Sequence, residues 1–221
     1  MKVEDLIRFY PNLYHMAESG TWDTIRRYGL LSTSALLDLF QISGEQRRVI
    51  ESERRPRSVQ ITHPTYGAAV IRDQKPMHET GLLKCLQDGI TPSEWYETLN
   101  RRVFFWLSKD RLDRLLSARA YKKTQHCILT LSTEELLSNH AKNVTLSPIN
   151  SGATLYIPQP RGKNTFLSVA NYPFEEWVRK RNVENAVVEL VVDYAVPDVD
   201  KFVQRVDERK ADTHVKTIYV R

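Results

Sequence analysis

Segments rich in β-branched and apolar residues follow one another closely in the last third of the chain. They cover residues 143–147, 147–158 (a turn and then a strand), 165–169, 185–197 and 214–220. Two of the four neighbouring pairs leave no room for the helix that must connect two parallel strands. The pattern therefore predicts an α+β fold with a mostly antiparallel sheet rather than a doubly wound parallel one.

The first two-thirds of the chain contains most of the predicted helices. Ser43, Thr91 and Ser132 each precede a Gln or Glu by three residues and predict capping boxes, and Ser108 predicts a further N-cap. Predicted helices cover 3–9, 24–28, 34–40, 43–52, 91–100, 109–121, 132–140, 174–181 and 199–206. Predicted strands cover 13–17, 58–62, 102–108 and 126–131, with a strand and a loop between 66 and 77.

Length and composition favour one globular domain over residues 1–221. Hydrophobic residues make up 41% of the chain and charged residues 27%, which are ordinary globular values. No apolar run is long enough to cross a membrane, and residues 1–12 lack the apolar stretch of a secretory signal. Cys85 and Cys127 have no metal-ligand spacing and are expected to be reduced, so the sequence predicts a cytoplasmic protein without membrane contact.

Positive charge predicts a polyanionic partner, with nucleic acid the first choice. The net charge is +5, and arginines gather between Arg47 and Arg57 and again between Arg179 and Arg181. Each cluster taken alone is more often a solvated surface, since basic patches are common on proteins that bind no polyanion. The sequence has no GxGxxG motif, no P-loop and no zinc-binding motif, so neither a Rossmann or Walker nucleotide site nor a metal is expected.

Glu189 is the most unusual residue of the segment 185–197, because it stands among valines, Leu190 and Ala186. In a strand, alternation places Val187, Glu189 and Val191 on one face and Leu190 and its neighbours on the other. A carboxylate buried without a partner costs several kcal/mol or raises its pKa. Glu189 is therefore neutralised by a partner cation, lines a cleft, or faces solvent on a wetted sheet.

Two other strands carry residues with functional potential. His15 stands in the strand 13–17, where a structural histidine is the simpler interpretation. The strand 102–108 contains three consecutive aromatic residues and ends at Ser108, and here an ordinary core strand is the simpler interpretation.

Together these strands resemble a known enzyme family. LYHMAESGTWDTIRRYGLLS resembles the start of the ADP-ribosyltransferase fold, with its histidine strand and Gly-Leu turn. RVFFWLSKDR and VVELVVDYAVPDVDKF resemble the aromatic and glutamate strands of the DarT-type transferases that modify nucleic acids. The resemblance spans roughly residues 10–206, and a more distant one exists to RNA 2′-phosphotransferases, which also consume NAD. It implies a split antiparallel sheet and NAD as the co-substrate.

The resemblance also implies roles for single residues. Glu189 would be the catalytic glutamate, which stabilises the positive charge that develops on the ribose. His15 would bind the adenosine-side ribose, and the backbone of Met16 and Ala17 would bind the carboxamide. The remaining implied NAD contacts are Phe105 or Trp106 as a stacking surface, and Ser108 at the end of the aromatic strand.

Arginine would reach the diphosphate or the target. Arg111 is the implied catalytic arginine, although its spacing differs from the family pattern and Lys109 and Arg114 compete for the role. Arg72 lies in an insertion with no counterpart and is a candidate for a second NAD or substrate contact. Asn150 and Ser151 are candidates for holding a phosphate through backbone N–H groups, with a plain β-turn as the simpler alternative.

Two departures from the family pattern bear on the target. The aromatic strand lacks the tyrosine that many relatives have, and residue 187 is valine where arginine-modifying transferases have Glu or Gln. The sequence therefore predicts an NAD-dependent ADP-ribosyltransferase of DNA or RNA, a toxin of a toxin–antitoxin or anti-phage system with a possible antitoxin partner. A protein ADP-ribosyltransferase, an NAD glycohydrolase and a non-catalytic nucleic-acid-binding protein are the alternatives.

Overall fold

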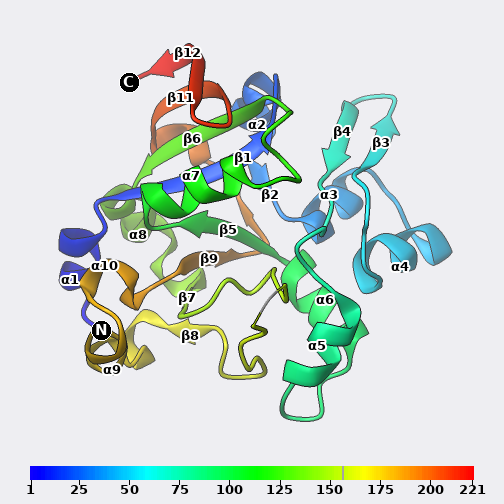
Figure 1. Cartoon of the computed structure of the whole chain (residues 1–221). Coiled ribbons are helices and arrows are strands. Elements are labelled where there is room, and N and C mark those ends of the chain that lie inside the picture. The colour runs from blue at the N-terminus through cyan, green and yellow to red at the C-terminus, as the bar shows by residue number, and fades with distance from the viewer. Residues whose placement is uncertain (156) are drawn as a thin grey trace.

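A computed structural model describes residues 1–155 and 157–221. Its centre is an eight-stranded antiparallel sheet with the strand order β12-β11-β6-β1-β5-β9-β7-β8 (Figure 1). The strands are β1 (Asn12–Glu18), β5 (Arg102–Trp106), β6 (His126–Ser132), β7 (Val144–Ser147), β8 (Leu167–Ser168), β9 (Glu189–Asp193), β11 (Val203–Lys210) and β12 (Thr213–Val220). The predicted α+β class with an antiparallel sheet is confirmed.

Helices surround the sheet, and most of them come from the first two-thirds of the chain, as predicted. They are α1 (Val3–Phe9), α2 (Trp22–Tyr28), α3 (Thr33–Leu39), α4 (Gly44–Ser52), α5 (Glu79–Cys85), α6 (Pro92–Asn100), α7 (Lys109–Ser117), α8 (Thr133–His140), α9 (Phe174–Lys180) and α10 (Val183–Ala186). Within the described ranges, no helix is long and apolar enough to cross a bilayer.

The main core lies against one face of the sheet. Leu13, Phe105, Leu129 and Leu190 are fully buried there, at alternate positions of neighbouring strands. On the opposite face α7 crosses in front of β1 and β5 (Figure 1) and packs Leu112 and Leu116 against Tyr14, Met16 and Trp106. Both faces of the central strands are therefore covered.

The sheet is joined weakly between β1 and β5. β1 pairs with β6 along its whole length, but only Tyr14 pairs with a residue of β5, Trp106. Beyond that pair, the His15 ring lies in the gap and its Nδ1 bonds to the carbonyl oxygen of Phe104 at 2.8 Å. The two halves of the sheet thus part at His15.

The Gly-Leu turn and the Val-Pro turn, far apart in the sequence, meet in space. β2 (Leu30–Leu31) pairs with β10 (Ala195–Val196). Gly29 has a φ of 85°, and a Cβ at this position would lie 2.5 Å from the Cα of Pro197. Glycine is therefore required here both for its conformation and for the close approach of the two backbones.

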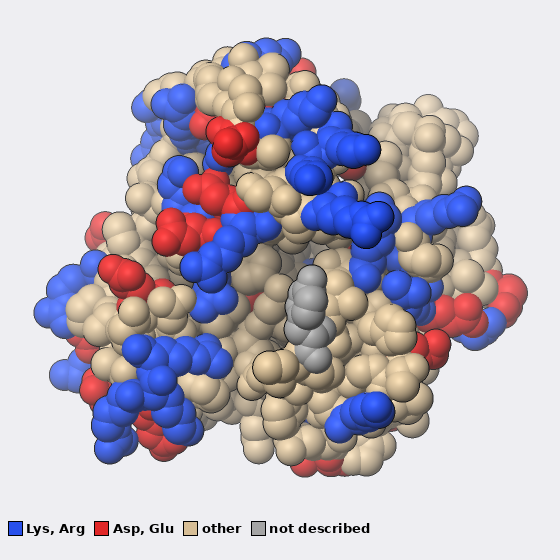
Figure 2. All heavy atoms as spheres, viewed as in Figure 1, with Lys and Arg blue, Asp and Glu red and all other residues tan. Residues whose placement is uncertain are grey.

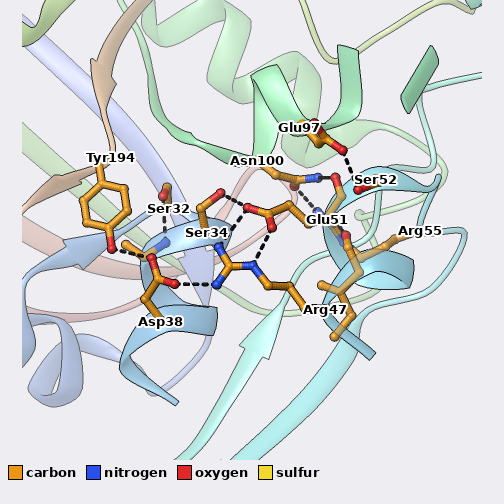
Figure 3. A network of polar contacts seen from close by, with 12 residues as sticks. Ser32, Ser34, Asp38, Arg47, Glu51, Ser52, Arg55, Glu97, Asn100 and Tyr194 are labelled. Carbon is orange, nitrogen blue, oxygen red and sulfur yellow. Dashed lines mark hydrogen bonds and ion pairs between the residues drawn. The ribbon is translucent and has the colours of Figure 1, made fainter. Parts of the chain in front are cut away.

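A hairpin and three helices form a separate layer beside the sheet. The hairpin of β3 (Val59–His63) and β4 (Gly67–Ile71) projects from the molecule next to α3 and α4 (Figure 1). Figure 3 shows a polar network that ties this layer together, in which Arg47 of α4 lies between Asp38 of α3 and Glu51. Asn100 of α6 joins it by donating to the Glu51 carbonyl at 2.7 Å.

The predicted capping residues differ in outcome. Thr91 forms the full capping box with Glu94, and the Ser132 hydroxyl accepts from the Glu135 N–H at 3.3 Å. Ser43 and Ser108 occupy the predicted N-cap positions of α4 and α7, but their side chains form no cap hydrogen bond to the described part of the chain, so the predicted capping box at Ser43 is wrong.

The segment 185–197 was predicted to be one continuous strand, and this prediction is wrong. Residues Val183–Ala186 form the short helix α10, and β9 begins at Glu189. Val187 consequently leaves the strand alternation and packs in the core cluster with Leu190 and Val192. Glu189 is therefore at the start of its strand and not in the middle.

Three other predictions are also wrong. Residues 199–206 were expected to be helical, but only a single 3-10 turn, Val199–Lys201, precedes β11. α5 was not predicted at all. The strand predicted within 147–158 is absent from its described residues, where a turn and irregular backbone follow β7; residue 156 lies outside the described residues.

Candidate functional site

A cavity of about 420 Å³ opens where β1 and β5 part. Its walls come from these two strands, from α2 and the Gly-Leu turn, from the β3–β4 hairpin and from the turn after β7. Eight of the residues expected to form a site line it: His15, Met16, Arg72, Phe105, Trp106, Asn150, Ser151 and Glu189. The fold thus brings together side chains from five separate segments of the sequence.

Glu189 is buried in the wall of this cavity, with 4% of its surface exposed. It stands in register with Trp106 of β5 on one side and Ser147 of β7 on the other. The backbone N–H of Ser151 donates to both carboxylate oxygens, at 3.1 and 3.2 Å. Burial raises the pKa of Glu189 to about 7, while the contact with Ser151 and the charges of Arg161 and Arg111 lower it in part.

The turn that carries Ser151 is held by Arg161. This arginine is 1% exposed and donates to the carbonyl oxygens of Ser151 at 2.7 Å, Ala153 at 2.9 Å and Gln159 at 3.1 Å. The Ser151 N–H donates to Glu189 and is therefore not free to bind a phosphate, as was suggested for this turn. The turn positions the carboxylate instead.

The hydroxyl of Ser151 is buried beside Glu189 and lacks a hydrogen bond of acceptable geometry to any described residue. It lies close enough to lower the pKa of the carboxyl group without being well oriented toward it. Buried polar atoms are nearly always paired in folded proteins. Ser151 Oγ is therefore a buried polar atom with unused hydrogen-bonding capacity in the wall of the cavity.

His15 lies across the cavity and is electrically neutral at pH 7. Burial lowers the pKa of His15 to about 4, against the effect of its hydrogen bond to Phe104. Because a carbonyl oxygen only accepts, Nδ1 carries the ring hydrogen and Nε2 carries the lone pair. His15 therefore provides a hydrogen-bond acceptor, Nε2, in the lining of the cavity.

Arg72 closes the cavity from the hairpin side. It follows β4 and donates to the carbonyl oxygen of Ala17 at 3.2 Å, with its guanidinium 5.4 Å from the ring centre of Tyr121. Asp73 accepts a hydrogen bond from the Tyr121 hydroxyl at 3.1 Å. Tyr121 also lines the cavity, and sequence reasoning missed it because it placed Tyr121 at the end of the helix predicted over 109–121, whereas α7 ends at Ser117.

Three expected site residues lie outside the cavity lining. Ala17 contributes only its carbonyl oxygen, which Arg72 occupies, and Ser108 lies at the start of α7 away from the lining. Arg111 points to a second hollow and donates to Asn185 at 2.8 Å. Of its competitors, Lys109 pairs with Asp113 at 2.9 Å and Arg114 is exposed.

Arg161 is the main residue that sequence reasoning missed. It stands alone in the segment PQPRGK, which has no periodicity and no recognisable motif. Its three carbonyl acceptors come from residues that only the folded loop brings together. The one available signal was the Pro-rich composition around it, which indicates irregular backbone whose carbonyls need partners.

A family model matches residues 11–203, which include every element that lines the cavity. It is described as "Family of unknown function (DUF7002)". The chain belongs to this family. Neither a curated protein nor a solved structure matches the chain. The match to DUF7002 includes the histidine, aromatic and glutamate strands, but the family description names no activity.

Proposed function

We propose that the chain is an NAD-dependent ADP-ribosyltransferase that modifies a nucleic acid. The observation that carries the proposal is the placement of Glu189: a buried carboxylate, fixed by the Ser151 N–H, in the wall of a cavity that His15 and Trp106 also line. The cavity volume of about 420 Å³ lies within the usual range for small-molecule and cofactor sites. The resemblance of the same three strands to ADP-ribosyltransferases supports the proposal independently.

The chemistry needs one well-placed carboxylate. The bond between C1′ of the ribose and N1 of nicotinamide breaks, and neutral nicotinamide leaves with the bonding electrons. The ribose then carries positive charge, which an ionised Glu189 at C1′ stabilises. The acceptor atom of the nucleic acid forms the new bond to C1′ and loses its proton, for which the same carboxylate is a suitable base.

The electrostatics of the cavity fit a substrate with a positive ring. In the free protein the pKa of Glu189 is about 7, so protonated and ionised forms coexist at neutral pH. The positive nicotinamide ring favours the ionised form. On the other side of the cavity, the neutral ring of His15 presents the Nε2 lone pair to a ribose hydroxyl, and Trp106 offers an aromatic surface to the nicotinamide.

The test is a comparison of the wild type with Glu189→Gln. Both proteins are incubated with NAD labelled in its adenylate part and with DNA, RNA or lysate protein. We expect label on a nucleic acid with the wild type, and at least a hundredfold less with the variant. Transfer to protein alone, release of free ADP-ribose alone, or no cleavage of NAD by the wild type would each reject the proposal in its stated form.

A toxin role is the proposed biological setting. Expression of the wild type in a bacterium should arrest growth, and expression of Glu189→Gln should not. Equal amounts of soluble protein in the two cultures are the control. Growth arrest by both proteins would show that the toxic effect does not need the Glu189 carboxylate. That result would favour a non-catalytic protein that binds nucleic acid.

A further inference from the structure

A second hollow of about 330 Å³ lies on the other side of the turn that carries Ser151. Three arginines from three different segments line it: Arg111 of α7, Arg161 of the loop between β7 and β8, and Arg181 just after α9. Figure 2 shows Lys and Arg side chains gathered around the hollowed centre of this face. The hollow is therefore a strongly basic part of the surface.

The three charges are not neutralised within the described part of the chain. None of the three arginines forms an ion pair with a described carboxylate. Their partners are neutral oxygens, namely Asn185 for Arg111 at 2.8 Å, the Pro148 carbonyl for Arg181 at 2.6 Å and the carbonyls of the loop for Arg161. The buried Nε of Arg111 has no described partner.

Cations placed this close together favour an anionic ligand between them. Burial and the charges of Arg181 and Arg114 lower the pKa of Arg111, while the charges of Glu189 and Tyr10 raise it in part. Arginine presents its donors as a planar fork that matches phosphate oxygens. The forks of Arg111 and Arg181 at one hollow therefore indicate a phosphorylated ligand, and the buried Arg161 adds a positive charge behind them.

The hollow adjoins the candidate catalytic residue. Asn150 lines both the hollow and the cavity, and Val188 lines the hollow while its neighbour Glu189 lines the cavity. Ser151 links the two, because its N–H binds Glu189 and its carbonyl oxygen binds Arg161. A ligand in the hollow would thus lie beside the reacting atoms without occupying the space of NAD.

Apolar side chains complete the hollow. Leu155 and Ile157 line it with 47% and 80% of their surface exposed, which is unusual for side chains of this size. A nucleotide chain offers both a phosphate for the arginines and a flat base face for apolar contact. An isolated phosphate would make no use of this apolar rim.

We propose that this hollow binds the phosphodiester backbone of the single-stranded nucleic acid that accepts ADP-ribose, so that one base reaches Glu189 through the side lined by Asn150. The identity of the bound strand as acceptor rests on the proposed function, whereas its binding to the arginines does not. A single strand is required because chemistry on a base needs that base out of the stack.

Binding is tested first, and without catalysis. The probes are fluorescein-labelled single-stranded DNA and RNA oligonucleotides of about twelve nucleotides, a length comparable to known single-strand sites. Their affinity is measured by anisotropy for Glu189→Gln and for Glu189→Gln combined with Arg111→Gln and Arg181→Gln. Arg161 is left in place because it holds the loop. The matched control combines Glu189→Gln with Lys210→Gln and Lys216→Gln, two exposed lysines of the β11–β12 hairpin.

We expect the double arginine change to weaken binding at least tenfold and the lysine change to leave it within twofold. The slope of log Kd against log salt should fall by about 1.4 for two lost phosphate contacts. The DNA and RNA arms decide which polymer is preferred. No binding by Glu189→Gln to either oligonucleotide, or equal affinity with and without the two arginines, overturns the proposal.

The acceptor role is tested in the background with an intact Glu189. For each protein, the fraction of cleaved NAD whose ADP-ribose is found on the oligonucleotide is compared with the fraction released into water. The double arginine variant should lower the first fraction at least tenfold. An unchanged fraction with a raised KM for NAD would assign these arginines to the NAD diphosphate and overturn the proposal. If the wild type cleaves no NAD, the proposed function fails. The binding experiment still shows whether the hollow binds a single-stranded nucleic acid.

Discussion

The backbone N–H of Ser151 donates to both carboxylate oxygens of Glu189, at 3.1 and 3.2 Å. These hydrogen bonds connect the turn after β7 to Glu189, the first residue of β9. Arg161 fixes the position of Ser151 by donating to its carbonyl oxygen. The two hydrogen bonds fix the direction of a carboxylate that has no ion-pair partner within 4 Å among the described residues. The buried charge is therefore oriented but not neutralised, and this has measurable consequences.

The stability of the fold should fall as the pH rises through the titration of Glu189. Its pKa is about 7 in the folded protein against 4.5 unfolded, so the folded state binds more protons between these values. The free energy of unfolding should therefore decrease between pH 4.5 and 7, by about 3 kcal/mol in all. Glu189→Gln, which has no charge to bury, should be more stable than the wild type at pH 8 and nearly equal to it at pH 4.5. Urea unfolding at both pH values measures the difference.

His15 does not disturb this comparison. Its pKa is lowered from 6.5 to about 4, so the folded state binds fewer protons in that interval and stability rises with pH there. The effect is opposite in sign to that of Glu189 but is present in both proteins, and it cancels in their difference. Parallel stability profiles for wild type and Glu189→Gln would contradict the raised pKa of Glu189.

The rate of NAD cleavage should follow the ionisation of the same carboxyl group. Because only the ionised form stabilises a positive ribose, kcat/KM for NAD should rise with pH and level off above a midpoint near pH 7. The profile of kcat should have a lower midpoint, since the positive nicotinamide ring favours ionisation in the complex. Initial rates between pH 5 and 9 test this expectation. A midpoint near 4.5 in kcat/KM would mean that burial does not raise the pKa.

Sequence patterns located the strands that carry the site because each of them has a strong local signal. β1, β5 and β6 show aromatic or β-branched runs that exclude a stable helix, and their predicted bounds are correct to within two residues. β11 was mistaken for a helix for a physical reason. Its irregular register between Val203 and Arg205 places buried residues at Val203 and Val206, a spacing of three that imitates a helical period.

Other parts of the site have no local signal. α5 contains Gly81, which lowers helix propensity, yet a Cβ there would lie 2.9 Å from the Thr154 carbonyl oxygen. The loop after β7 was predicted to be a strand, but Arg161 binds its carbonyls in place of a neighbouring strand. Both features depend on contacts between segments far apart in the sequence, and no window of the sequence contains them.

His15 should have separable structural and binding roles. In His15→Asn the side-chain amide can still donate to the Phe104 carbonyl, but the acceptor at Nε2 is lost. We expect near wild-type stability with a KM for NAD raised about tenfold, in line with one lost hydrogen bond of about 1.4 kcal/mol. His15→Leu removes both groups and should also reduce stability by about 1–3 kcal/mol, because the Phe104 carbonyl is left unpaired. Equal KM values for wild type and His15→Asn would remove His15 from the binding site.

Asn100 should be a stabilising centre of the helical layer beside the cavity. It is 3% exposed, accepts from Arg55 at 2.8 Å and donates to the Glu51 carbonyl at 2.7 Å (Figure 3). Asn100→Leu keeps the volume but leaves Nη2 of the buried Arg55 and the Glu51 carbonyl without these partners, and we expect a loss of about 3 kcal/mol. Ser52→Ala removes an exposed hydrogen bond of the same network and should change stability by less than about 0.5 kcal/mol. Similar urea midpoints for the two variants would contradict the assigned role of Asn100.

Arg161 should act on activity through the geometry of the loop. Its guanidinium satisfies three carbonyl oxygens at once, which neither a lysine nor an apolar residue can do. Arg161→Met should reduce stability by about 3 kcal/mol or more, whereas Arg161→Lys keeps the charge and should recover part of that loss. Arg161→Met should raise the apparent pKa of Glu189 in the kcat/KM profile, because the charge of Arg161 and the Ser151 hydrogen bond both lower that pKa, and Arg161→Lys, which keeps the charge, should raise it less. A loss of stability with an unchanged pH profile would show that Arg161 supports the fold alone and does not position Glu189.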